Sequence, residues 1–275
     1  MNPLIMPLVS IMMPARNVAE CIVDTIRSIQ EQSYSNWELI FVDDGSTDST
    51  LLIVRNLAGF DPRIKVFAME HGGRGKARNM CISHCSGKYV AVCDSDDVSF
   101  PDRFEKQVDY MEKNSDIACL ASWWIPFSTS KPDKSSKRLG VFPCSSEEIA
   151  DSFARKKMRF HNATAMLRRE LFDKYGAFNV DLRRAQDYEF YSRLNKAGER
   201  FFCMNEPLVY YRQESNIPSI AYFVENGIYM AYADYLLGGG TLPFKLYSEK
   251  PISSFWKLYY KLKYGYFFLK MRFLS

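Results

Sequence analysis

The sequence predicts an α/β fold built on a mostly parallel sheet that is flanked by helices. Short apolar runs rich in β-forming residues alternate with helix-length amphipathic segments from the start of the chain, and parallel strands need such crossover helices between them. Three of the predicted strands end in polar residues, as expected where the carboxyl ends of parallel strands form a crevice. With 275 residues, 47% of them hydrophobic, the chain can bury a large core.

The predicted elements of the first half follow one another without repeats or low-complexity tracts. Val18, Ile22, Ile26 and Ile29 recur at the spacing of one helical face, so the segment that carries them is an amphipathic helix. The predicted order is strand 8–14, helix 18–32, strand 37–43, helix 48–59, strand 63–69, helix 76–85 and strand 88–93.

The pattern is looser after residue 97. Pro101 suits the first turn of a helix, to which Phe104, Val108 and Met111 give an apolar face. The chain then offers an apolar strand at 117–127, a basic surface loop at 128–138, and strand or helix segments at 161–169, 186–196 and 201–212. We therefore expect mixed topology in this second half.

Composition narrows the class of protein. A formal net charge of +4 is too small to imply nucleic-acid binding. The seven cysteines are scattered, mostly within apolar runs, which predicts buried thiols in a reducing compartment. The N-terminus has no basic start and contains Pro3 and Pro7, and no stretch reaches the roughly 18 apolar residues of a spanning helix. We expect neither a signal peptide nor a membrane span, and a cytoplasmic location.

An acidic cluster follows the predicted strand 88–93, in the order Asp94, Ser95, Asp96, Asp97. Like charges this close raise one another's pKa, so the cluster needs a cation, hydrogen-bond donors or a solvated turn. In extended backbone Asp94 and Asp96 point to the same side, where two oxygens suit a hard divalent cation that keeps water and phosphate as its other ligands. The alternative is a solvated acidic turn that caps the helix near Pro101.

Two other polar segments each allow two interpretations. The run that starts at Asp43 and Asp44 contains Asp-Gly, which is turn chemistry, but a carboxylate at a strand end can also accept hydrogen bonds from a nucleobase imide and ribose hydroxyls. The segment 71–79 joins three glycines to cations at a helix start, which favours phosphate. It has the spacing of neither a dinucleotide-binding fingerprint nor a P-loop.

Taken together, these motifs resemble those of the family 2 glycosyltransferases. The matching runs are Pro14-Ala-Arg-Asn17, Phe41-Val-Asp-Asp-Gly-Ser-Thr-Asp48, Gly75-Lys-Ala-Arg-Asn79, and Asp94-Ser-Asp-Asp97 with Pro101-Asp-Arg103. The resemblance extends over about residues 8 to 215. It implies an inverting enzyme of the GT-A fold that takes a sugar from a nucleotide donor, with Mn²⁺ or Mg²⁺ as cofactor. Because the family often builds bacterial surface glycans on lipid carriers, it also implies a glycan or lipid-linked acceptor.

The resemblance also implies roles for individual residues. Asp43 would bind the base and Asp94 would face the ribose, while Asp96 would hold the metal ion between two phosphates, with Asp97 beside it. The nucleotide-sugar site would comprise Pro14, Ala15, Asn17, Asp43, Asp44, Arg78, Asp94 and Ser95. Residues 1–100 would form the nucleotide-binding half of one domain and residues 101–215 its acceptor and catalytic half, followed by a C-terminal helical tail at 216–275.

A catalytic carboxylate lies in this family at the start of a later helix, usually within a Glu-Asp pair. Here Gln186 takes the Glu position, and Asp187 would be the base. The positive end of the helix dipole would keep Asp187 ionised, ready to receive a hydroxyl proton as the glycosidic bond forms. The alternative is that Asp187 only caps the helix or pairs with Arg183 or Arg184.

Two positions depart from the family pattern. Where many relatives carry a His after a Tyr-Arg pair, this chain has Glu214, so Glu214 or water would supply the third metal contact. His161 is followed by Asn where Pro is common. It would either contact the acceptor or donor sugar, or be a hydrogen-bonded structural residue.

The end of the chain, at 252–275, interleaves aromatic residues with Lys and Arg and is interrupted only by Gly265. Such a segment suits a bilayer interface, where aromatic rings lie at headgroup level and cations meet anionic lipid. We expect peripheral association with the inner face of the cytoplasmic membrane. The alternative is a helix docked on the catalytic core or on a second subunit of a homo-oligomer.

Other functions fit parts of the sequence. A haloacid-dehalogenase-like phosphatase would use Asp94 as nucleophile and Asp96 as acid and base, but it leaves Asp43 and Arg78 unexplained. A glycosidase needs carboxylates on both sides of the scissile bond. A non-catalytic scaffold would bind a nucleotide sugar without turnover, against which the pairing of Asp96 with Asp187 argues. The preferred interpretation is a hexosyl- or N-acetylhexosaminyltransferase that uses a UDP-sugar, because Asp43 suits uracil.

Overall fold

The computed structural model describes residues 6–128, 139–158, 160–213 and 220–241, together with positions 244 and 258. Glu214, most of the expected loop at 128–138 and nearly all of the tail at 252–275 lie outside these residues. By its contacts the chain divides into two compact units. The first comprises Met1–Ala177 and Leu194–Glu214, and the second comprises Phe178–Arg193 and Ser215–Ser275.

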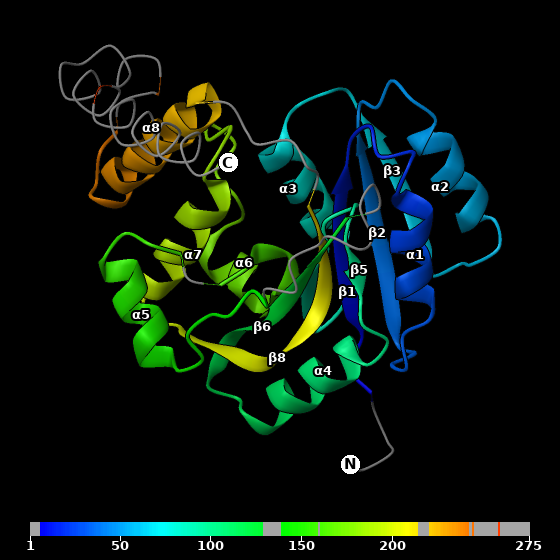
Figure 1. The fold of residues 1–275 in the computed structure, drawn as a ribbon, viewed down its shortest axis with the longest axis horizontal. Helices are drawn as coiled ribbons and strands as arrows, with labels where there is room; N and C mark the ends of the chain where they lie inside the picture. Colours follow the sequence, from blue (N-terminus) through cyan, green and yellow to red (C-terminus); the bar gives the residue numbers. More distant parts are fainter. Residues whose placement is uncertain are drawn as a thin grey trace, which may run out of the picture. The chain divides into compact units, whose positions relative to one another are not determined.

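Parallel strands and crossover helices form the first half of the first unit, as the alternating apolar runs predict (Figure 1). The strands are β1 (Val9–Ala15), β2 (Trp37–Asp44), β3 (Ile64–Met69) and β4 (Tyr89–Val92). The helices between them are α1 (Ile22–Gln30), α2 (Thr50–Ala58) and α3 (Arg74–His84). Every residue of β2 is buried, as is usual for a parallel strand covered on both faces.

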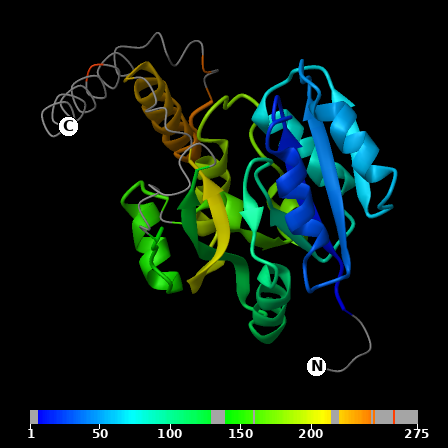
Figure 2. The ribbon, with the colours of Figure 1, turned by 45° about the vertical axis from the view of Figure 1, so that its right-hand side comes forward.

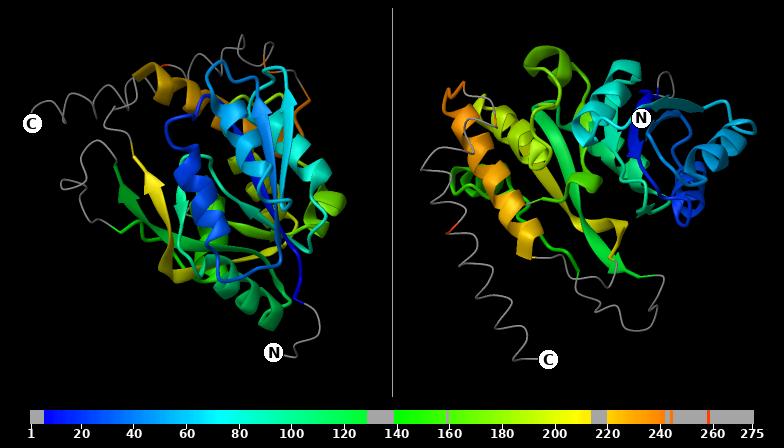
Figure 3. Two further views of the ribbon diagram at one scale, coloured as in Figure 1. Left: turned by 90° about the vertical axis from the view of Figure 1, so that its right-hand side faces the viewer. Right: turned by 90° about the horizontal axis from the view of Figure 1, so that it is seen from above.

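The strand order explains how the helices cover this sheet. From β1 the chain moves outward to β2 and β3 and then returns to the other side of β1 at β4. Because crossovers between parallel strands are right-handed, α1 and α2 lie on one face and α3 lies on the other (Figure 3). The carboxyl ends of β1, β2 and β4 therefore meet at one edge of the sheet, and the loops at 16–21, 45–49 and 93–97 extend from it.

The second half of the sheet is mixed, as predicted. Strand β7 (Met166–Arg168) is antiparallel to both of its neighbours, β4 and β6 (Ile117–Phe127). Strand β8 (Arg200–Arg212) runs parallel to β6, and Figure 2 shows these two long strands side by side. The short β5 (Val98–Ser99) completes the order β3-β2-β1-β4-β7-β6-β8-β5. The remaining elements are α4 (Arg103–Lys113), α5 (Ser146–Ala154), the 3₁₀ turn η1 (Asn162–Thr164) and α6 (Glu170–Tyr175).

Two helices contribute to the second unit: the start of α7 (Gln186–Lys196) and α8 (Ile220–Leu237). Phe178–Arg193 group with α8 in this unit and are bonded to it, while the predicted domain boundary at residue 215 stays a prediction. The Tyr188 hydroxyl donates to Asp234 at 2.8 Å, and Arg184 pairs with Glu225 at 2.8 Å. In the part of the chain that the structure describes, no helix combines the length and apolarity that crossing a membrane requires.

Candidate active site

Asp43, the next-to-last residue of β2, lies opposite Ala15, the last residue of β1, and is only 2% exposed. Its Oδ2 accepts the Ser46 N–H at 2.9 Å, whereas its buried Oδ1 has no hydrogen-bond partner in the described structure. A buried carboxylate oxygen without a donor is costly. The corner formed by Pro14, Ala15 and Asp43 therefore suits a ligand that brings a donor, although the assignment of these residues to the nucleoside stays a prediction.

Asn17 joins the loop after β1 to the loop after β2. It adopts a left-handed conformation (φ 55°), which Asn tolerates better than most residues. Its backbone N–H donates to Ser46 Oγ at 2.9 Å, and its Oδ1 accepts the Thr47 N–H at 2.8 Å. A third hydrogen bond between the two loops runs from the Ala19 N–H to Asp48 Oδ2 at 3.1 Å. Asn17 thus fixes the wall of this corner.

Asp44 holds the glycine-rich loop in place. Its carboxylate accepts the backbone N–H groups of Gly72 at 2.7 Å and of Gly73 at 3.1 Å, and it contacts His71 Nδ1 at 3.0 Å. The next residue has to be glycine. Gly45 has a φ of +68°, and an added Cβ would lie 2.7 Å from the backbone nitrogen of His71. The structure thus gives Asp44 a positioning role, and contact with the nucleotide stays a prediction.

Arg78 lies on the helix that this loop begins. Helix α3 starts at Arg74, directly after Gly73 in its left-handed conformation, as the run of glycines and cations predicts. The Arg78 side chain is buried within the first unit. The loop and the first turn of α3 form a helix N-terminus of the kind that binds phosphate, but contact of Arg78 with a base or diphosphate is untested and stays a prediction.

The acidic cluster forms a turn, and the expectation of extended backbone through Asp94 and Asp96 is wrong. The Asp97 N–H donates to the Asp94 carbonyl at 3.3 Å, which closes the turn. The carbonyls of the two central residues of the turn are bonded by side chains from distant parts of the chain. Ser95 C=O accepts from Thr25 Oγ1 at 3.2 Å, and Asp96 C=O accepts from Arg212 Nε at 2.7 Å.

Arg212, at the end of β8, is a site residue that the sequence analysis missed. Besides its bond to the Asp96 carbonyl, its backbone N–H donates to Asp97 Oδ1 at 2.9 Å. The sequence signal for Arg212 is the Tyr211-Arg212 pair, from which only a metal contact of Glu214 was predicted. Asp97 is 5% exposed, and its Oδ2 finds no partner among the described groups. The alternative of a solvated acidic turn therefore does not describe Asp97.

Electrostatics favour a cation at this turn. Burial raises the pKa of Asp96, and the neighbouring Asp94 carboxylate raises it further. The same two causes raise the pKa of Asp97 to about 8. Within the described residues, no group of three or more His, Cys, Asp or Glu side chains is arranged as a metal site. The carboxylate oxygens of the turn fit a hard divalent cation that takes its remaining ligands from a diphosphate and water.

His161 lies among aromatic rings of the first unit. Its ring stacks edge-on against Tyr211 at 4.3 Å and lies 5.3 Å from the Trp124 ring, measured between centroids. Its backbone carbonyl accepts the Thr164 hydroxyl at 2.8 Å. The His161 segment is thus firmly held, and contact of its side chain with a sugar stays a prediction.

Asp187 belongs to the second compact unit. It lies in the first turn of α7, as the sequence predicts, and its Oδ1 accepts the Tyr188 N–H at 2.9 Å. The alternative pairing with Arg184 is not formed, since Arg184 pairs with Glu225. Asp187 makes no ion pair with the described part of the chain. Its role as base, like the metal contact of Glu214 outside the described residues, stays a prediction.

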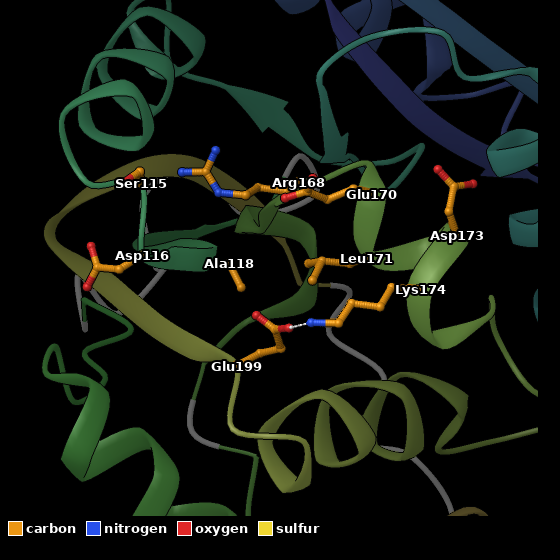
Figure 4. Close-up of a pocket in the computed structure, with 9 residues that line it drawn as sticks. All are labelled: Ser115, Asp116, Ala118, Arg168, Glu170, Leu171, Asp173, Lys174 and Glu199. Atoms are coloured by element: carbon orange, nitrogen blue, oxygen red, sulfur yellow. Dashed lines mark hydrogen bonds and ion pairs between the residues drawn. The ribbon is translucent and has the colours of Figure 1, made fainter.

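A cavity of about 560 Å³ lies at the opposite edge of the sheet (Figure 4). Arg168, which lines the cavity, lies on β7 opposite Tyr89, the first residue of β4, whereas the acidic turn follows the last residue of β4. Lys174 and Glu199 point toward each other across the cavity and form an ion pair at 2.9 Å. None of the predicted site residues lines this cavity.

Comparisons with known proteins agree with the motifs. The model of the family "Glycosyl transferase family 2" matches residues 10–176. A Bacillus subtilis protein named as glycosyltransferase EpsE is 31% identical over 229 residues, which cover 81% of this chain and 80% of that protein. A second B. subtilis protein, named as teichuronic acid biosynthesis glycosyltransferase TuaG, is 33% identical over 211 residues, which cover 76% of this chain and 81% of that protein.

Solved structures agree on the fold. TarS from S. aureus, in complex with UDP, has a TM-score of 0.62 at 21% identity and covers 82% of this chain, which itself spans 65% of that structure. The mannosyltransferase PcManGT from Pyrobaculum calidifontis has a TM-score of 0.63 at 20% identity, with coverages of 88% and 67%. These likenesses confirm the predicted GT-A fold. Because the family model also matches more than half of the chain and both B. subtilis relatives align over most of their length, the chain belongs to glycosyl transferase family 2.

Proposed function

We propose that this protein is an inverting glycosyltransferase that moves a sugar from a nucleoside-diphosphate donor to a hydroxyl group of a glycan or lipid-linked acceptor. The observation that carries the proposal is the buried acidic turn after β4, whose Asp97 Oδ2 lacks a partner in the described structure. It shares one sheet edge with the Asp43 corner. One nucleoside diphosphate with a cation would satisfy both.

The donor we favour is a UDP-sugar carrying a hexose or an N-acetylhexosamine. The partnerless Asp43 Oδ1 is suited to the imide N–H of uracil, and Asp94 follows β4, which is paired to the same β1 strand. Solved relatives of the fold hold UDP, UDP-GlcNAc and GDP-Man in their complexes. A guanosine donor is therefore the first alternative to test.

Asp96, with Asp94 beside it and Asp97 as a further candidate, would hold Mn²⁺ or Mg²⁺. When bound, such a cation supplies stabilisation of the charge that develops on the leaving diphosphate. PcManGT, a neighbour in fold, was solved with Mn²⁺. Arg212 positions the turn through the Asp96 carbonyl and Asp97 Oδ1.

Asp187 would accept the proton of the attacking hydroxyl. Its carboxylate lies in the first turn of α7, and no ion pair with a described residue competes for it. As the acceptor oxygen forms its bond to the anomeric carbon, the bond to the diphosphate breaks on the opposite side. Direct displacement of this kind inverts the anomeric centre.

The biological setting is part of the proposal. TuaG is named for teichuronic acid biosynthesis, which supports a role in surface-polysaccharide biosynthesis. We propose a cytoplasmic protein whose aromatic and basic tail associates with the inner face of the membrane, with no nucleic-acid partner. The alternative is a tail helix that docks on the catalytic core or on a second subunit of a homo-oligomer.

The proposal is tested first by binding. UDP, GDP, dTDP and CMP are each added with Mn²⁺, with Mg²⁺ or with a chelator, and the melting temperature is measured, because a ligand of the native state stabilises it. We expect one nucleotide to raise the melting temperature in a metal-dependent way, and Asp96→Asn to abolish the effect. A folded sample that responds to none of them at saturation contradicts the proposal. Binding without transfer to any acceptor would indicate the scaffold alternative.

A further inference from the structure

A chain of buried polar side chains crosses the core of the first unit below the acidic turn. Arg103 is 1% exposed, and Gln107 and Thr164 are fully buried. Arg103 and Gln107 lie one turn apart on α4, and Thr164 ends η1. Buried polar groups are costly unless they are hydrogen-bonded, so the presence of these three side chains in the core calls for an explanation other than packing.

Arg103 binds both ends of the acidic turn. Its Nη2 donates to the Val92 carbonyl at 2.9 Å, and its Nη1 contacts Cys93 Sγ at 3.3 Å and Ser99 Oγ at 3.1 Å. Val92 and Cys93 come directly before Asp94, and Ser99 comes two residues after Asp97. The guanidinium group therefore fixes where the turn leaves β4 and where it enters β5.

The charge of Arg103 has no conventional partner. Among the described residues, no carboxylate lies within ion-pair distance of it, and the four groups that accept its hydrogen bonds are all uncharged. A buried cation without an ion pair is strongly unfavourable unless nearby negative charge offsets it. Arg103 contacts Cys93 and Ser99, and the residues between these two include Asp94, Asp96 and Asp97, whose carboxylates can supply such charge.

Gln107 extends the chain away from the turn. Its Oε1 accepts from Arg103 Nε at 3.1 Å, and its Nε2 donates to the Thr164 carbonyl at 2.8 Å. The Thr164 hydroxyl accepts the Ser122 N–H at 3.1 Å and donates to the His161 carbonyl at 2.8 Å. Hydrogen bonds therefore run without interruption from the acidic turn to the His161 segment.

We propose that Arg103, Gln107 and Thr164 form a positioning network, in which Arg103 is the internal counter-ion of the acidic turn and the other two fix that turn relative to the His161 segment. The inference rests on the proposed function, since it gives these residues a task in binding a diphosphate with its cation. Each of them acts through other residues, because all are buried beneath the site.

The first test compares two arginines. Arg168 also donates to backbone carbonyls, of Ile117 at 2.9 Å and of Met111 at 2.9 Å, but at the opposite edge of the sheet. We expect Arg103→Met and the control Arg168→Met both to lower the melting temperature. At a temperature where both are folded, only Arg103→Met should weaken binding of the free nucleotide with Mn²⁺, by about tenfold in calorimetry.

Arg103→Lys separates charge from geometry. It keeps the positive charge but cannot reach all four acceptors, so it should recover part of the lost affinity. A folded Arg103→Met protein with wild-type affinity, or an equal loss of affinity in Arg168→Met, overturns the counter-ion role. If Arg103→Met does not fold, the comparison is made between Arg103→Lys and Arg168→Lys with the same expected order.

A double-mutant cycle tests the rest of the network. Arg103 and Thr164 are bridged by Gln107, so the effects of Arg103→Lys and Thr164→Val on nucleotide affinity should be non-additive, and this coupling should vanish in a Gln107→Leu background. Additive effects in both backgrounds overturn the network. A wild-type protein that binds none of the four nucleotides refutes the proposed function instead, and the network with it; wild-type binding with unaffected variants refutes the network alone.

Discussion

Glu38 provides the sharpest test of how the fold is stabilised, because it is a buried carboxylate far from the proposed chemistry. It is 4% exposed, and its oxygens accept from Ser10 Oγ at 2.5 Å, from the Ser86 N–H at 2.8 Å and from Lys65 Nζ at 2.6 Å. Burial opposes its ionised form, but the hydrogen bonds of Lys65, Ser10 and Ser86 outweigh burial and lower the pKa of Glu38 to about 2.

The expected magnitude follows from this pKa. A carboxyl group whose pKa falls from 4.5 to about 2 on folding contributes about 3 kcal/mol at neutral pH. Since Lys65 is half exposed, solvent screening reduces this to about 2 kcal/mol. Because the folded form binds the proton more weakly than the unfolded form, the contribution is complete above pH 4.5 and is lost as the pH falls toward 2.

The assay is urea unfolding of the wild type and of Glu38→Gln from pH 7 down to the lowest pH at which both are folded. We expect Glu38→Gln to be about 2 kcal/mol less stable at pH 7, with the difference shrinking below pH 4.5. Glu206→Gln is the matched control, because Glu206 also pairs with a lysine, Lys106, at 2.6 Å, but its side chain is 38% exposed; it should change stability by less than about 0.5 kcal/mol. Equal stability of Glu38→Gln and wild type, or a difference that does not change with pH, would refute this reasoning.

Three further substitutions test the site. Asp43→Asn should weaken UDP binding about tenfold in calorimetry, because an amide cannot offer two acceptor oxygens; unchanged affinity would remove Asp43 from the base site. Asp187→Asn should stop sugar transfer while sparing nucleotide binding, measured by product formation and thermal shift, and transfer at the wild-type rate would exclude it as the base. Gly45→Ala should cost about 1–3 kcal/mol in urea unfolding, because of its positive φ and the nearby His71 nitrogen; a cost below that of an exposed Gly59→Ala control would contradict this.

The sequence predicted the parallel strands well because their signal is local. β2 and β4 are buried along their whole length, so each appears as a mainly apolar run, which in β2 is interrupted by Glu38 and ends in Asp43 and Asp44. The position of the acidic cluster after a strand was equally clear from the sequence, whereas its turn conformation was not. That conformation depends on Thr25 and Arg212, which are distant in sequence, and no local pattern reveals which carbonyl a distant side chain will bond.

Buried polar residues were the other limit of sequence analysis. On α4 the apolar residues Phe104, Val108 and Met111 marked the buried face, as the structure confirms. Arg103 and Gln107 are buried on the same helix, although their side chains are typical of a solvent-facing surface. The bonds of the Asp44 carboxylate to the backbone of the glycine loop are likewise not visible in the sequence, and its assignment to the nucleotide site stays a prediction.

The bond between Arg212 and the acidic turn has a consequence for biogenesis. The two partners are 115 positions apart in the chain, and a ribosome releases the N-terminal strands long before β8 is made. The parallel strands can pair as soon as they emerge, but the turn gains the two bonds of Arg212 only after β8 has joined β6. The acidic turn therefore gains its full set of bonds late in synthesis, and a nascent chain that stops short of β8 holds the Asp43 corner without them.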